Sequence, residues 1–274
     1  MAARRFLPSD PADLVRSIVP LGLLAIAAAV PGVRWLVLVG LAAGTGIAIG
    51  RAAPVRWSWA AALPVAIGLA WLTWRGERFA PNGLDCTSPT SPFAVARLGE
   101  AILVVGVLVT LAVLLGASRS GLGLELPARR YRSWAVAGFL VAGPLALLTG
   151  PILAGPFFGP VSYDIGQVGA IGPALVFAIS NGVMEELAYR GALMTWSARV
   201  IGMGPALVGQ ALVFGLAHSG ADVLGSPALL MATMAVGGLL AGVVALRTRS
   251  LLVPIAVHVG LDIPIYYAWA CAGT

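Results

Sequence analysis

Long apolar runs separated by short polar connectors extend along the whole chain. A helix needs about 20 mostly apolar residues to cross a bilayer, and these runs approach that length. They are continuous, whereas the strands of a membrane barrel alternate apolar and polar residues. Because only helices and closed barrels satisfy their backbone hydrogen bonds in lipid, the pattern predicts an all-α, polytopic transmembrane bundle of about eight or nine spans. The predicted spans are 17–31, 33–50, 57–74, 93–117, 133–155, 167–189, 204–219, 227–246 and 250–271.

The composition agrees with this pattern. Of 274 residues, 59% are hydrophobic and 10% are charged, whereas about 25% are charged in an ordinary soluble domain. So few charges cannot cover the surface of a soluble protein. We divide the chain into N-terminal transmembrane helices of no recognised type, 1–132, and a C-terminal transmembrane core, 133–274.

The basic residues indicate membrane topology and not a nucleic-acid partner. The net charge of +6 comes from 17 arginines, with no lysine, and 11 acidic residues. The arginines lie in short connectors and form no single basic face, so we expect no binding to nucleic acid. If successive connectors lie on opposite sides of the membrane, 13 arginines fall on one side. The other four, Arg34, Arg75, Arg78 and Arg97, fall on the other side. Because cytoplasmic loops are rich in Arg, we predict a multi-pass protein of a bacterial plasma membrane, with a cytoplasmic N-terminus and an external C-terminus.

The first apolar run could belong to a cleaved signal peptide, because it follows Arg4, Arg5 and Arg16 and ends in small residues. However, Asp10 and Asp13, together with two prolines, make the leading segment too long and too acidic for such a signal. We therefore expect a retained membrane anchor.

The two cysteines, Cys86 and Cys271, fall on the same predicted external side. A disulfide is possible in that compartment. Two free thiols are equally compatible with the sequence, because it does not show whether the two Cα atoms come within bonding range.

Ionisable side chains inside membrane helices are costly and mark functional sites or buried pairs. Such residues gather in the C-terminal half, which holds both histidines of the protein, and we find no counterpart in 1–140. The set comprises Glu185, Glu186, Arg190, His218, His258 and Asp262.

The run NGVMEELAYRG contains the acidic pair. Glu186 and Arg190 are four residues apart, with the acid nearer the N-terminus, which favours an ion pair. Glu185 points about 100° away from Glu186. It shares a face with Asn181 and has no opposite charge at ideal spacing, as suits a general base for water activation. The alternative is that both acids form a structural network with Arg190 at the membrane edge.

In QALVFGLAHSG, Gln210, Phe214 and His218 recur every four residues. A hairpin turning near Gly202 would place His218 and Glu186 at nearly equal depth. This requires that 191–203 extends the preceding helix or re-enters the membrane, which also places Arg190 deeper than a loop charge. Otherwise, His218 is a core histidine.

In PIAVHVGLDIP, His258 and Asp262 lie on one helical face at i and i+4. The carboxylate could orient the imidazole towards the cavity that holds Glu185 and His218. Alternatively, the two residues form a buried pair that locks two helices together.

Together, these three segments resemble the CAAX-protease and bacteriocin-processing family of intramembrane proteases. The match is to EExxxR at 185–190, FxxxH at 214–218 and HxxxN/D at 258–262, and the resemblance covers about 165–270. It implies hydrolysis of a peptide bond within the membrane. Glu185 is then the general base that holds a water with His218, while Glu186 pairs with Arg190.

The resemblance also implies that His258 and residue 262 stabilise the oxyanion. Because an ionised Asp cannot donate a hydrogen bond as Asn can, Asp262 is either protonated or only orients His258. No cofactor is favoured. Zinc is the alternative, with Glu185, His218 and His258 as its ligands.

The expected function is therefore an intramembrane endopeptidase that acts on a membrane-associated protein or peptide. Two alternatives stay open: a non-catalytic scaffold or bacteriocin-immunity factor of the same fold, and a proton-coupled transporter. The expected partners are the peptide or protein substrate and the lipid bilayer. The sequence indicates neither the substrate, including whether it is prenylated, nor the oligomeric state.

Overall fold

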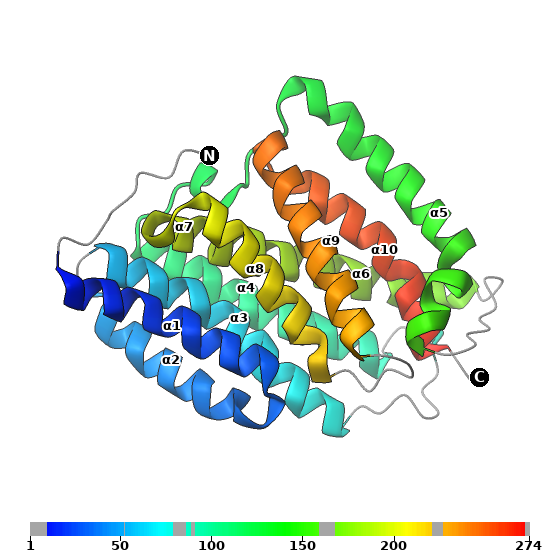
Figure 1. Cartoon of the computed structure of the whole chain (residues 1–274). Coiled ribbons are helices and arrows are strands. Elements are labelled where there is room, and N and C mark those ends of the chain that lie inside the picture. The colour runs from blue at the N-terminus through cyan, green and yellow to red at the C-terminus, as the bar shows by residue number, and fades with distance from the viewer. Residues whose placement is uncertain are drawn as a thin grey trace.

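The computed structural model describes residues 10–51, 53–78, 86–88, 91–158, 168–220 and 227–271. These residues form helices and connectors with no strand, so the predicted all-α class is confirmed (Figure 1). The helices are α1 Pro11–Ala29, α2 Arg34–Ala48, α3 Ala53–Arg78, α4 Pro92–Leu114, α5 Arg132–Phe158, α6 Ile171–Glu185, a π-helix Glu186–Met194, α7 Thr195–Ile201, α8 Met203–Ala217, α9 Pro227–Thr248 and α10 Leu252–Ala270.

Six helical stretches of the described residues are long and apolar enough to cross a membrane, and α8 and α10 are shorter apolar helices. The protein is therefore an integral, multi-pass membrane protein. The sixth predicted span, 167–189, ended too early, because α6 continues through the π-helix and α7 as one stretch, Val168–Ile201. The predicted extension of this helix beyond Arg190 is thus confirmed.

The helix ends follow from local sequence. The side chain of Asp10 accepts a hydrogen bond from the backbone N–H of Ala12 at 2.8 Å and caps α1, whose first residue is Pro11. Gly202 separates α7 from α8 with a φ of 84°, a conformation that favours glycine. The predicted turn near Gly202 therefore lies where the spacing of Glu186 and His218 required it.

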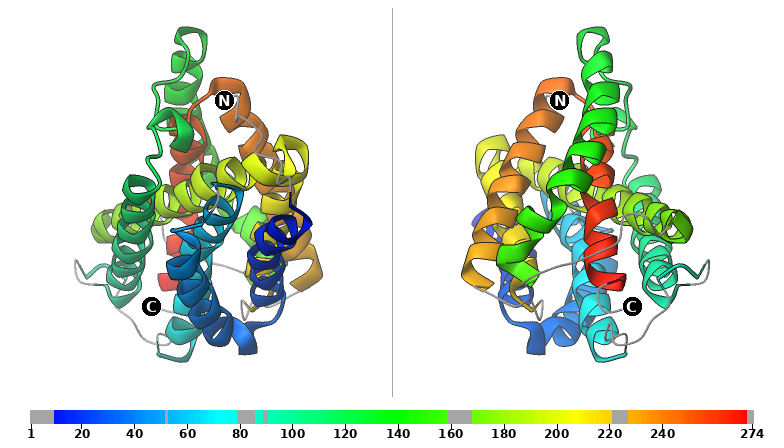
Figure 2. Two further views of the ribbon diagram at one scale, coloured as in Figure 1. Left: turned by 90° about the vertical axis from the view of Figure 1, so that its left-hand side faces the viewer. Right: turned by 90° about the vertical axis from the view of Figure 1, so that its right-hand side faces the viewer.

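Helix α6 packs between α4 and α10, and α3 contacts the π-helix and α7 (Figure 2). Small residues permit these close approaches, as expected for membrane helices. A Cβ added to Gly215 of α8 would lie 2.5 Å from the backbone oxygen of Met231 in α9. Helices from both halves of the chain therefore surround the segment that carries the two glutamates.

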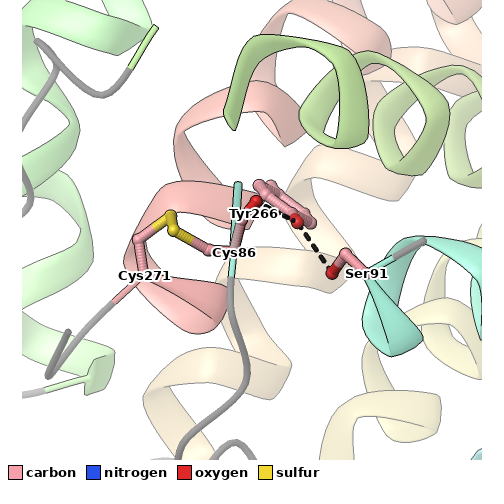
Figure 3. Close-up of a disulfide and its surroundings, with 4 residues drawn as sticks. All are labelled: Cys86, Ser91, Tyr266 and Cys271. Carbon is pink, nitrogen blue, oxygen red and sulfur yellow. Dashed lines mark hydrogen bonds between the residues drawn. A yellow bond between two sulfur atoms is a disulfide. The ribbon is translucent and has the colours of Figure 1, made fainter. Parts of the chain in front are cut away.

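The two cysteines form a disulfide, with their Cα atoms 5.2 Å apart (Figure 3). Beside it, the Tyr266 hydroxyl donates to the backbone oxygen of Cys86 at 2.9 Å and lies 2.8 Å from Ser91 Oγ. The bridge therefore joins the end of α10 to the segment before α4, and of the two alternatives for the cysteines the structure shows the pair.

Two arginines that we assigned to external connectors lie inside the bundle instead. Arg34 is 3% exposed and Arg97 is 6% exposed. Arg34 Nε donates to the backbone oxygen of Ala27 at 3.1 Å, and NH1 donates to Thr73 Oγ1 at 3.3 Å, so this guanidinium joins helix ends. The predicted count of 13 arginines against four therefore included buried side chains, and the orientation of the chain in the membrane stays a prediction.

Candidate active site

The π-helix places the two glutamates and Arg190 within the bundle. Glu185 ends α6 and Glu186 begins the π-helix. Arg190 NH1 lies 3.0 Å from Glu186 Oε1, and each of these two side chains is 1% exposed. The predicted ion pair is therefore present, and Arg190 is deep in the protein instead of at its edge. π-Helical turns inside α-helices are frequent at functional sites.

His258 of α10 reaches both glutamates. Its Nδ1 lies 3.0 Å from Glu186 Oε1, and its Nε2 lies 3.5 Å from Glu185 Oε2. Gly182 of α6 makes this approach possible, because a Cβ there would lie 3.0 Å from Val259 Cγ2 and 3.5 Å from His258 Cβ. The contact of His258 with Glu186 was not predicted from the sequence, because it joins residues 72 positions apart.

Asp262 lies on the other side of the same imidazole. Its Oδ2 is 3.6 Å from His258 Nε2 and accepts a hydrogen bond from Asn181 Nδ2 at 2.8 Å. The shorter contact to the ring is therefore that of Glu186, and Asp262 contacts α6 through Asn181. The predicted pairing of Asp262 with His258 is present as a longer contact.

His218 lies at the end of α8, and the ring of Phe214 is near both His218 and His258. Its Nδ1 is 2.8 Å from the backbone oxygen of Phe214. The Phe214 ring centroid is 5.1 Å from that of His218 and 6.4 Å from that of His258. Within the described part of the chain, His258 is the histidine in direct contact with carboxylates, and none of the ion pairs formed there joins His218 to Glu185. Any link between Glu185 and His218 therefore needs a bridging molecule.

Glu185 borders a pocket between α3, α4, α6 and the π-helix. The side chain of Glu185 is 14% exposed and that of His258 is 16% exposed, whereas Glu186 is 1% exposed. Of the two glutamates, Glu185 is thus the one that solvent or substrate can reach. The lining residues are Pro64, Val65, Gly68, Leu69, Leu72, Glu100, Val104, Met184, Glu185, Ala188 and Tyr189.

Our sequence reasoning missed Glu100 as a residue of this pocket. Arg97 NH1 lies 2.9 Å from Glu100 Oε2 in α4, and Glu100 is 1% exposed. The expectation that 1–140 has no counterpart to the ionisable residues of the C-terminal half was therefore wrong. An acid three residues from an arginine inside an apolar run was the available signal.

We also compared the site with a zinc centre. Among the described side chains, no group of three or more His, Cys, Asp or Glu is arranged to hold a metal ion. The candidate zinc ligands Glu185, His218 and His258 do not form such a group. We therefore derive no step through a metal.

Comparison with known proteins supports the resemblance seen in the motifs. Residues 167–263 match the model of the family described as Rce1-like, type II CAAX prenyl endopeptidase Rce1-like. No curated protein and no solved structure matches the chain. The matched segment runs from just before α6 into α10 and contains every predicted site residue. This C-terminal region of the membrane protein therefore belongs to the CAAX-protease and bacteriocin-processing family of intramembrane proteases.

Proposed function

We propose that the protein is an intramembrane endopeptidase in which Glu185 activates a water for attack on a peptide bond. The observation that carries the proposal is the position of His258, whose two ring nitrogens face Glu186 and Glu185 at 3.0 and 3.5 Å. Two segments far apart in the sequence thereby supply polar groups to one partly accessible place. The substrate class that this site and its family support is a membrane-associated protein or peptide.

In the proposed reaction, a water lies between Glu185 and His218. Glu185 removes a proton as the water oxygen forms a bond to the scissile carbonyl carbon. When the C–N bond breaks, Glu185 returns this proton to the leaving amine. The products are a carboxylic acid and an amine, and no further reactant is consumed.

The oxyanion of the tetrahedral intermediate is stabilised by His258, with Asp262 beside it. With a proton on both ring nitrogens, His258 donates through Nδ1 to Glu186 and presents its Nε2–H to the side of Glu185. Arg190 balances the charge of Glu186 at 3.0 Å, which keeps this orienting carboxylate ionised and fixed. Glu186 and Arg190 are thus positioning residues, whereas Glu185, His218 and His258 contact the reacting atoms.

The decisive experiment compares the wild-type protein with Glu185→Gln after reconstitution into vesicles. Because Gln retains the shape of Glu but accepts no proton, we expect cleavage to fall by about 10²- to 10⁴-fold. Candidate substrates are hydrophobic membrane-anchored peptides, with and without a prenylated C-terminal cysteine motif. Glu125→Gln, in a connector far along the chain from the site, is the matched control.

Undiminished cleavage by Glu185→Gln would contradict the mechanism. A phenotype in cells that survives this substitution would instead favour the scaffold or immunity role. Metal analysis of the purified active protein tests the metal-free route, for which we expect no stoichiometric zinc.

A further inference from the structure

A pair of arginines, Arg56 and Arg199, lies near the end of α7 that is farther from the two glutamates. Arg199 of α7 stands over the ring of Trp57 in α3, with its Cζ 3.8 Å from the ring centroid. Trp57 in turn contacts Trp196, with ring centroids 5.4 Å apart. Arg56 is next to Trp57 in α3, and α3 packs against α7. Two arginines therefore lie in the region where α3 begins and α7 ends.

These two arginines have no acidic partner among the residues that the structure describes. Among the ion pairs that the described residues form, none includes Arg56 or Arg199. Both side chains are partly buried, and the Nε of each is buried without a hydrogen-bond partner. A guanidinium whose Nε is buried without a partner is unfavourable unless an anion compensates its charge.

The connector between α4 and α5 adds hydrogen-bonding groups next to Arg199. A Cβ on Gly121 would lie 3.6 Å from Arg199 NH2, so this connector borders the guanidinium. The hydroxyls of Ser118 and Ser120 lie 2.9 Å apart in the same turn and are exposed. The turn is fastened to α7, because Thr195 Oγ1 donates to the backbone oxygen of Gly121 at 2.9 Å.

We infer that Arg56 and Arg199 form a binding site for a phosphate-bearing anion, with Ser118 and Ser120 at its edge. Arginine forks match phosphate oxygens and are well suited to this ligand. The chemistry fits the headgroup of an anionic phospholipid as well as free inorganic phosphate. The headgroup is the nearer source, because the site lies at a helix end of a membrane protein, where anionic lipids attract arginine. This inference does not depend on the proposed peptidase function.

The test uses the full chain purified in a neutral detergent and titrated with phosphatidylglycerol, with bound lipid counted by native mass spectrometry. Because hydrogen bonds to charged groups are lost with both guanidinium groups, we expect Arg56→Gln/Arg199→Gln to bind at least about tenfold more weakly. The matched control is Arg129→Gln/Arg130→Gln, which removes two exposed arginines from a neighbouring connector. In detergent, without a charged membrane surface, this control should bind as the wild type does.

Two further measurements distinguish the source of the anion from a merely structural role. Stabilisation by inorganic phosphate equal to that by phosphatidylglycerol would assign the site to free phosphate, whereas stabilisation by the lipid alone would assign it to a headgroup. In anion-free detergent, Arg56→Gln should melt at the same or a higher temperature than the wild type, because it removes repulsion from Arg199.

The inference is overturned if the double variant binds both anions as tightly as the wild type. It is also overturned if Arg56→Gln lowers the melting temperature in anion-free detergent and leaves the gain from added anion intact. In that case, the arginine acts only through packing.

Discussion

At the scale of single residues, one oxygen of Glu186 serves two partners, Arg190 NH1 and His258 Nδ1, each at 3.0 Å. The guanidinium compensates the buried negative charge, and the carboxylate fixes the ring. Stability and orientation of the site thus depend on the same atom, and substitutions can separate the two effects.

We predict that Glu186→Gln alone lowers the free energy of unfolding by about 3–5 kcal/mol, because it leaves the charge of Arg190 buried and unpaired. The double variant Glu186→Gln/Arg190→Met removes both charges and should recover most of that loss. Its cleavage rate should stay low, because His258 has lost its charged partner. Thermal melting and peptide cleavage, measured on the same preparations, check both parts.

A second prediction concerns Asp262, whose Oδ2 accepts the hydrogen bond of Asn181. Asp262→Asn retains an oxygen for this bond and gains an N–H₂ donor that can serve the oxyanion. We expect it to keep activity within a few fold of the wild type. Asp262→Ala should lose about 10²-fold or more, because it removes both contacts. Equal loss in the two variants would show that the carboxylate itself is needed.

At the scale of helices, the approach of α10 to α6 decides where His258 lies. Gly182 leaves room for this approach, since Val259 Cγ2 would be 3.0 Å from an added Cβ. The sequence motifs identify residues on single helices, but the distance between two helices depends on such packing. For that reason we anticipated the pair of Glu186 with Arg190 and the turn at Gly202, but not the contact of Glu186 with His258.

Gly182→Ala should therefore reduce cleavage by about tenfold or more while the protein still folds, because misplacing a catalytic group by a fraction of an ångström is costly. Gly172→Ala is the control on the same helix, since nothing lies within 4 Å of its added Cβ. Val259→Ala in the Gly182→Ala background removes the side-chain part of the clash and should restore part of the rate. Cleavage assays of the three variants give the answer, and equal rates in the two glycine variants would contradict this account.

The π-helix is another feature that the sequence did not indicate. Its residues, ELAYRGALM, fit an ordinary α-helix equally well, and the spacing of Glu186 and Arg190 predicts their pairing in either form. The π-helix packs against α3 and α8, which lie far from it in the sequence or beyond the turn at Gly202. The residue types of the site were thus predictable, whereas their mutual geometry required the folded bundle.

At the scale of the whole molecule, apolar runs and connector arginines were sufficient to predict the class and the succession of the helices. They could not reveal the contribution of the N-terminal half, because a helix face that packs and one that contacts lipid have the same composition. Glu100 borders the pocket of Glu185 from α4, outside the segment that matches the family. The site thus includes residues from both predicted parts of the chain.

The disulfide joins these two parts across 185 residues of sequence. We predict that Cys86→Ser/Cys271→Ser lowers the melting temperature, because removal of a native disulfide typically costs about 2–4 kcal/mol. Cleavage below the melting transition should remain, because neither cysteine lines the pocket. A reducing agent should shift the wild type to the melting temperature of the variant and leave the variant unchanged. A reducing agent that shifts both equally would point to an unrelated effect.

α10 follows the segments that carry the two glutamates and His218, so the imidazole of His258 enters the membrane after them during synthesis. On the proposed mechanism, a nascent chain that holds only the earlier segments lacks the group that stabilises the oxyanion. Such a chain should therefore not cleave a substrate before α10 is inserted.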